Sequence, residues 1–206
     1  MYLNSEQEWQ GMREIGGIVG TVLAEMQAYA APGMSTTELD AFGQALLVKY
    51  GARSAPKLVY DFPGYTCISV NHEAAHGIPS SNKILQEGDL VNIDVSAERN
   101  GFFADNGGSF ILGESPNPLL ERLIDCSKSA LKKAIAGAKA GVKIRKVGKI
   151  MQDEARKHHF KVIKNLAGHG VGRSLHEEPE EIPCFNDRFN RDRFQKHTVV
   201  AIETFI

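Results

Sequence analysis

The sequence of 206 residues has few of the features that mark disulfide-linked, membrane-spanning or strongly charged proteins. Its three cysteines are an odd number, lie far apart and form no CxxC pair, so neither a disulfide framework nor a cysteine zinc site is expected. No apolar run approaches the length of a membrane span, and the polar start MYLNSEQEWQGMREIGG is unlike a signal peptide. The formal net charge of −1 gives no reason to expect a nucleic acid or an anionic membrane as partner. These absences predict a cytoplasmic protein.

The spacing of apolar residues and turn formers predicts one α+β domain over residues 1–206. A chain of this length can bury a sizeable core. Pro32-Gly33 separates two helices, because proline and glycine both interrupt helical structure. Helices are expected over residues 5–30 and 35–50. Extended and turn-rich sequence is expected over residues 54–80, followed by strands over 90–96 and 101–112.

The order of elements then begins again, which indicates an internal repeat. Helices expected over residues 119–139 and 144–159 mirror the first pair, and Gly141 matches Gly33. Two amphipathic helix pairs can also resemble each other by chance. A genuine repeat predicts helix pairs packed on a curved, mostly antiparallel sheet, in halves of about 1–113 and 114–206.

The segment NIDVSAERNGFFAD carries an aspartate on each arm of a predicted hairpin. Asn100-Gly101 is the strongest short-range signal for a two-residue type I′ turn, and this turn sets Asp105 opposite Ser96. Ser96 shares a strand face with Asp94, so the two aspartates are expected as diagonal neighbours, roughly 5.5–7 Å apart. Two carboxylates this close in apolar surroundings repel each other unless a cation lies between them.

Other residues extend this candidate cation site. Either aspartate alone is more simply a solvated strand residue or a turn former. However, HTVVAIE resembles GDLVNID, so Glu203 corresponds to Asp94, and His169 lies between glycines in AGHGVG. Carboxylate oxygens and an imidazole nitrogen together suit a pair of divalent ions, with no need for sulfur.

Four motifs occur together in the sequence: CISVNHEAAHGIP, GDLVNIDVSAERNGFFADNGGSF, KNLAGHGVGRSLHEEP and VVAIETFI. In their order and spacing, the chain resembles the type I methionine aminopeptidases over essentially its whole length. The resemblance implies a pita-bread fold, with two pseudo-symmetric halves around a dinuclear metal site. It also implies removal of the initiator methionine from nascent proteins, by attack of a metal-activated water on the first peptide bond.

The resemblance assigns roles to the candidate metal ligands by position. Asp94 is similar to the family's chelating aspartate and Asp105 to its bridging one, and His169 and Glu203 complete one metal's shell. The implied cofactors are two divalent ions, with Fe, Mn, Co and Zn as candidates. Such ions deprotonate a water between them and stabilise the developing oxyanion.

Two further histidines are implied to be catalytic. His76 resembles the histidine that contacts the scissile amide, and His176 the one that polarises the carbonyl oxygen or stabilises the tetrahedral intermediate. For each histidine taken alone, a structural hydrogen bond is the simpler role.

The pocket for the first side chain is expected to be apolar and adaptable, because methionine is unbranched and soft. Matching positions place Cys67, Phe62, Val59 and Leu175 at its wall, with His76 also contacting the substrate. The alternative is that all four wall residues belong to the ordinary core. Cys67 is not expected as a nucleophile, since its neighbours supply no base.

The sequence departs from the family in two places. The family continues into a strand that carries a fifth ligand, a bridging glutamate, whereas this sequence ends three residues after Glu203, so the C-terminal end is expected to be truncated. Thr204 stands where the family commonly has proline, which changes backbone stiffness but removes no ligand.

The expected partners are the N-terminal methionine peptides of nascent proteins, with the ribosome as a candidate, and the resemblance implies a monomer. A non-catalytic or weakly active module that binds peptide N-termini or a protein partner is the alternative, suggested by the missing ligand. A dipeptidase specific for proline in the second position is disfavoured, because the short N-terminus leaves no room for that group's usual extra domain.

Overall fold

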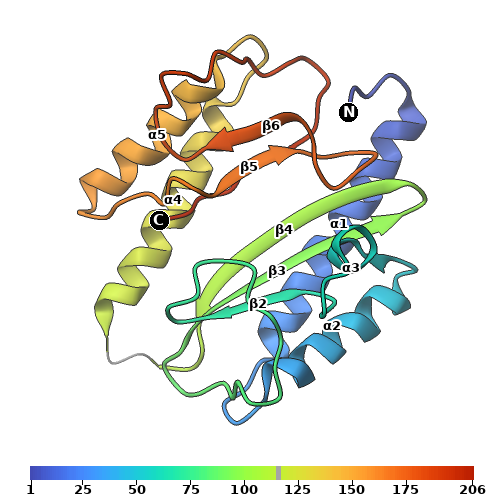
Figure 1. The fold of residues 1–206 in the computed structure, drawn as a ribbon, viewed down its shortest axis with the longest axis vertical. Coiled ribbons are helices and arrows are strands. Elements are labelled where there is room, and N and C mark those ends of the chain that lie inside the picture. Colours follow the sequence, from blue (N-terminus) through green and yellow to red (C-terminus); the bar gives the residue numbers. More distant parts are fainter. Residues whose placement is uncertain (115–116) are drawn as a thin grey trace. The chain divides into compact units, whose positions relative to one another are not determined.

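The computed structural model describes residues 1–114 and 117–206. These residues form two compact units, which are described separately below. The N-terminal unit consists of Gln7–Leu120 and Arg173–Leu175. The C-terminal unit consists of Met1–Glu6, Glu121–Gly172 and His176–Ile206. Helices and antiparallel sheets occur in both, which confirms the expected α+β class (Figure 1).

Two helices open the N-terminal unit, as expected: α1 (Glu6–Tyr29) and α2 (Thr36–Lys49). Along α1, buried apolar residues recur at helical spacing and form one apolar face. A capping box begins α2, because the Ser35 hydroxyl accepts from the Glu38 backbone while the Glu38 carboxylate accepts from the Ser35 backbone. The cap fixes the start of α2 as the sequence predicts.

The sheet of the N-terminal unit is antiparallel, with β3 paired to three neighbours. Its strands are β1 (Arg53–Ser54), β2 (Cys67–Val70), β3 (Leu90–Arg99) and β4 (Phe102–Ile111). Asn100 and Gly101 both have positive φ, 55° and 78°, as a type I′ turn requires. The hairpin has the predicted register, with Ser96 opposite Asp105.

The segment expected to be extended and turn-rich contains a short helix, α3 (Ala55–Tyr60), so that expectation was wrong for these residues. The Ser54 hydroxyl accepts from the Lys57 backbone, and a proline lies in the first turn. Asp61 ends the helix in the left-handed conformation. Local capping therefore stabilises this helix, which is too short for its apolar residues to form a recognisable helical repeat in the sequence.

The C-terminal unit packs helices α4 (Pro118–Gly137) and α5 (Ile144–Lys157) with a second antiparallel sheet, both helices being close to their predicted bounds. The strands, in the spatial order β6-β5-β7, are β5 (Ala167–Gly170), β6 (Glu177–Pro183) and β7 (Val200–Ala201). The buried cluster of this unit is Ala130, Ala134, Ile144, Val147, Met151, Ile182, Cys184 and Phe194.

The match of HTVVAIE to GDLVNID places Glu203 at the position of Asp94, which lies within strand β3, yet β7 contains only Val200 and Ala201. Beyond β7 the backbone bonds to other segments, since Phe205 accepts from the Ile163 amide and Thr204 accepts from the Ser127 hydroxyl. Glu203 therefore lies just after a strand rather than within one.

The helix pair repeats, as the sequence indicates. Gly33 and Gly141, matched by sequence, both have positive φ, 88° and 83°, a conformation that favours glycine. Each follows the first helix of its pair and precedes the second. The same turn chemistry therefore joins both helix pairs.

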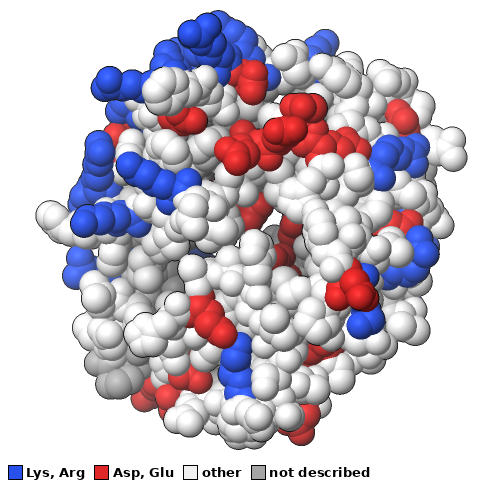
Figure 2. Space-filling view, viewed as in Figure 1, with Lys and Arg blue, Asp and Glu red and all other residues white. Residues whose placement is uncertain are grey.

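Surface charge is uneven within the C-terminal unit. Acidic side chains lie along β6, whose sequence is EEPEEIP, whereas lysines and arginines gather around α5 (Figure 2). Among the described helices, none is long and apolar enough to cross a membrane.

Candidate functional site

Asp94 and Asp105 lie on the two arms of the β3–β4 hairpin. Because Asp105 is opposite Ser96, two positions beyond Asp94, the carboxylates are diagonal neighbours on one face, as predicted. The Oδ1 atom of Asp94 is buried. Gly107 faces Asp94 across the ladder and presents no side chain to it. The hairpin therefore presents two partly buried carboxylates side by side.

Cys67 lies directly opposite Asp94 in the ladder between β2 and β3, and only 5% of it is exposed. Burial raises the pKa of the Cys67 thiol far above its usual range, and the carboxylates of Asp94 and Asp105 raise it further. The thiol is therefore protonated at neutral pH, which agrees with its expected lack of a nucleophilic role.

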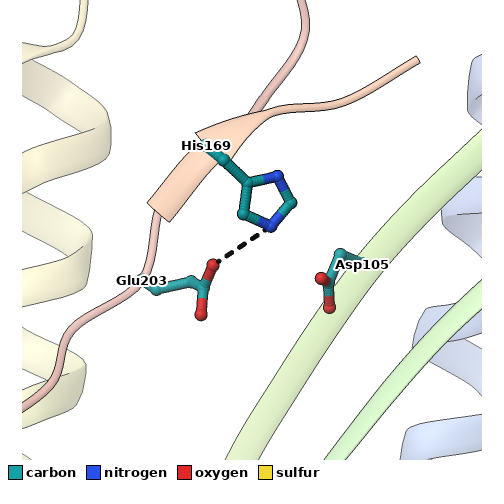
Figure 3. Close-up of side chains that lie close together, drawn as sticks. All are labelled: Asp105, His169 and Glu203. Carbon is teal, nitrogen blue, oxygen red and sulfur yellow. Dashed lines mark ion pairs between the residues drawn. The ribbon is translucent and has the colours of Figure 1, made fainter. Parts of the chain in front are cut away.

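His169 and Glu203 form an ion-pair contact within the C-terminal unit. His169 Nε2 lies 3.5 Å from Glu203 Oε1, and the histidine is buried (Figure 3). Its Nδ1 lies 2.9 Å from the carbonyl oxygen of Gly170. A carbonyl can only accept, so Nδ1 carries a hydrogen, and Nε2 is the ring nitrogen that faces Glu203. A histidine that ligates a metal through Nε2 holds its Nδ1 hydrogen in this way.

The glycines beside His169 allow strands to approach closely. A Cβ on Gly168 would overlap the carbonyl oxygen of Ala201 in β7, and one on Gly170 would overlap Glu178 in β6. The register of β5 with β6 also shifts between these glycines, and such a bulge re-aims the side chain it contains. The AGHG sequence thus packs two strands tightly around one histidine.

His176 lies beside His169, with ring centroids 3.9 Å apart, and is exposed just before β6. Figure 3 also draws Asp105, whose carboxylate projects from β4. His76 belongs to the N-terminal unit, where it is exposed and has a φ of 54°. Imidazoles and carboxylates are groups that move protons or bind cations.

The four predicted wall residues of the substrate pocket all belong to the N-terminal unit. Cys67 and Leu175 are buried and Phe62 is half-buried, whereas Val59 is 44% exposed on α3. A common wall formed by all four stays a prediction.

Sequence reasoning missed Asp40, a buried carboxylate on α2. It accepts hydrogen bonds from the backbones of Tyr65 and Thr66 and from the Thr66 hydroxyl. These bonds hold the segment that leads into Cys67. The sequence feature that could have identified Asp40 is an acidic residue within the apolar face of a helix, because Asp40 shares its buried face with Thr36, Gly43 and Leu47.

Each unit carries donor groups of the kind that divalent cations prefer. Asp94 and Asp105 offer carboxylate oxygens in the N-terminal unit, and Glu203 and His169 offer a carboxylate and Nε2 in the C-terminal unit. Each of these side chains is buried or half-buried, which limits competition from water.

The family model "Metallopeptidase family M24" matches residues 10–206. The whole chain is 50% identical to "Methionine aminopeptidase 2" of Bacillus subtilis and covers 82% of it. It is 43% identical to a methionine aminopeptidase of Staphylococcus epidermidis, again covering 82% of that protein.

Solved structures of similar fold include members of the same family. The crystal structure of a methionine aminopeptidase from Thermotoga maritima matches with a TM-score of 0.93 at 30% identity, over 99% of this chain and 82% of that one. The prolidase of Pyrococcus horikoshii shares the fold, with a TM-score of 0.82 at 22% identity over 98% of this chain and 55% of the prolidase. These matches confirm the expected pita-bread fold. The family model and the whole-length relatives show that this chain belongs to metallopeptidase family M24.

Proposed function

We propose that this protein is a metal-dependent aminopeptidase that removes the initiator methionine from nascent proteins. The observation that carries the proposal is the 50% identity to a methionine aminopeptidase along the whole chain. The matched region covers all 206 residues, so it spans both units and the segments predicted to bind metal and substrate. The substrate class is therefore peptides with an N-terminal methionine.

The residues proposed to hold two divalent ions are Asp94, Asp105, His169 and Glu203. Their mixed oxygen and nitrogen donors suit Fe, Mn, Co or Zn. A divalent ion in such a site makes water a stronger nucleophile and polarises a carbonyl oxygen. The hydrogen bond from His169 Nδ1 to Gly170 fixes the ring, so that this ligand needs no reorientation.

The two exposed histidines are proposed to act on the peptide bond itself. His76 contacts the scissile amide, and His176 polarises the carbonyl oxygen or stabilises the tetrahedral intermediate. The proximity of His176 to His169 supports this role, because it places an imidazole beside a proposed ligand.

The methionine side chain is proposed to contact Cys67, Phe62, Val59 and Leu175. With its protonated thiol, Cys67 acts there as a small, soft apolar group. A cytoplasmic location, a monomeric state and the ribosome as partner remain predictions.

The test is release of free methionine from Met-Ala-Ser and Met-Gly-Ser by the purified protein, with added Mn²⁺, Co²⁺ or Fe²⁺. Leu-Ala-Ser is the matched control peptide. The proposal predicts metal-dependent release of methionine with much slower release of leucine. A folded, metal-loaded protein that releases no methionine would contradict it.

A further inference from the structure

The loop that carries His76 returns to the strand from which it leaves. The amide of Gly77 donates to the Ser69 hydroxyl, with 3.0 Å between the atoms. The amide of Ile68 donates to the Gly77 carbonyl over 2.9 Å. Both backbone polar groups of Gly77 are thus satisfied by adjacent residues of β2.

These bonds lie at an edge of the sheet. In the described parts of the chain, the order β1-β3-β2 leaves one side of β2 without a neighbouring strand. On that side, Ile68 uses its amide to hold Gly77. The loop therefore covers the strand edge and is fastened to it at the residue after His76.

Gly77 lies so close to β2 that no side chain fits. A Cβ there would overlap the carbonyl group of Ile68 and the Cα of Ser69. Gly77 itself is buried, whereas His76 is exposed. The backbone at Gly77 is thus fixed, while the neighbouring imidazole faces outwards.

His76 adopts a left-handed backbone conformation, with a φ of 54°. Residues other than glycine rarely adopt it, and it persists where surrounding bonds hold it, often at functional sites. The bond from Gly77 to Ser69 is adjacent to this residue, and Ser69 is 2% exposed. A buried hydroxyl thus supports a strained histidine.

We propose that Ser69 is a positioning residue for His76: its hydroxyl fastens Gly77 to β2 and thereby fixes the direction of the imidazole. The inference rests on the proposed function, in which His76 contacts the scissile amide. Ser69 alternates with Ile68 along β2, so its side chain lies on the face of Cys67, whose ladder partner is Asp94. Ser69 acts through the loop and does not touch the substrate.

Ser69→Ala removes the hydroxyl, and Ser69→Thr retains it with a β-branched side chain that strands accept. Ser109→Ala is the matched control, because it removes the hydroxyl of another serine in the same sheet, one that accepts from Asn92. For Met-Ala-Ser, Ser69→Ala is expected to lower kcat about tenfold and to change KM by less than about twofold. Ser69→Thr and Ser109→Ala are expected to stay within about threefold of the wild type.

A double-mutant cycle separates positioning from a general structural role. In a His76→Ala background, Ser69→Ala is expected to cause no further loss of kcat, since there is no imidazole left to orient. If the loss of about tenfold persists in that background, or if Ser69→Ala leaves kcat unchanged in an active enzyme, the inference is overturned.

Amide hydrogen exchange tests the bond from the Gly77 amide to the Ser69 hydroxyl independently of catalytic activity. In Ser69→Ala the exchange of the Gly77 amide is expected to accelerate at least about tenfold, while Ser109→Ala leaves it unchanged. Unchanged Gly77 exchange in Ser69→Ala overturns the inference, whatever the activity. A wild type that releases no methionine contradicts the proposed function instead, so the two failures are distinguishable.

Discussion

Cys67 and Asp94 are direct partners across the β2–β3 ladder, which places a buried thiol beside a proposed metal ligand. Burial and the neighbouring carboxylates raise the pKa of the thiol, which keeps it protonated and makes it a poor nucleophile. Cys67→Ala is therefore expected to keep kcat within about fivefold of the wild type and to change mainly KM. Steady-state kinetics on Met-Ala-Ser check this. A loss of kcat by more than about a thousandfold would indicate covalent catalysis.

His176 and His169 are neighbours with different proposed roles. His176→Ala is expected to lower kcat by about a hundredfold while bound metal is retained, because its ring is proposed to act on the peptide carbonyl. His169→Ala is expected to lower bound metal, because Nε2 is a proposed ligand. Metal analysis and kinetics on the same samples distinguish them. Equal metal loss in both variants would make His176 a ligand.

Asp40 connects α2 to the segment that precedes Cys67. Asp40→Asn removes one acceptor oxygen from a carboxylate that accepts from Tyr65 and Thr66, and should lower the free energy of unfolding by about 1–3 kcal/mol. Glu14→Gln, an exposed carboxylate-to-amide change on α1, is the control. Urea unfolding of both variants provides the measurement. Equal stability would show that the Asp40 bonds contribute no more than a surface contact.

Ionisation of Glu154 makes the stability of the C-terminal unit depend on pH in the acid range. It is buried on α5, and hydrogen bonds from Lys133 and Ser129 lower the pKa of Glu154 from 4.5 to about 2. The folded-state pKa is the lower one, so the ionised carboxylate stabilises the fold above pH 4.5. This contribution is lost as the pH falls from 4.5 towards 2.

Glu154→Gln carries no charge at any pH, so it should be less stable than the wild type at pH 7, by about 1 kcal/mol. The difference should shrink through the acid range, and thermal unfolding at several pH values measures it. Asp153→Asn, an exposed neighbour on α5, serves as control. A constant difference from pH 7 to pH 3 would contradict the role of Glu154 ionisation.

The hairpin could be predicted in detail from sequence because one dipeptide determines its turn. Asn100-Gly101 fixes the register, and the register places Asp94 and Asp105 on one face. The turn glycines of the two helix pairs were equally readable, since positive φ favours glycine. Local rules sufficed in these places because the turn conformation itself selects the residue types.

Other features depend on contacts between distant segments. The bonds of Asp40 to Tyr65 and of Ser69 to Gly77 join residues that no periodicity relates. The shortness of β7 follows from the bonds that Thr204 and Phe205 make outside the ladder. Helix α3 was missed because capping, rather than an apolar repeat, defines it. Tertiary hydrogen bonds thus account for what the sequence pattern could not show.

Metal content and methionine release, measured on one purified sample, distinguish a metal-dependent aminopeptidase from a module that only binds peptides. No methionine release from Met-Ala-Ser is expected after chelation, and recovery is expected when about two equivalents of Mn²⁺ or Co²⁺ are bound. Asp105→Asn should bind less metal and release little methionine, whereas Asp125→Asn, an exposed carboxylate on α4, should match the wild type. Methionine release that persists in the chelated protein, or fully metal-loaded protein without any release, would contradict metal-dependent removal of methionine by this protein.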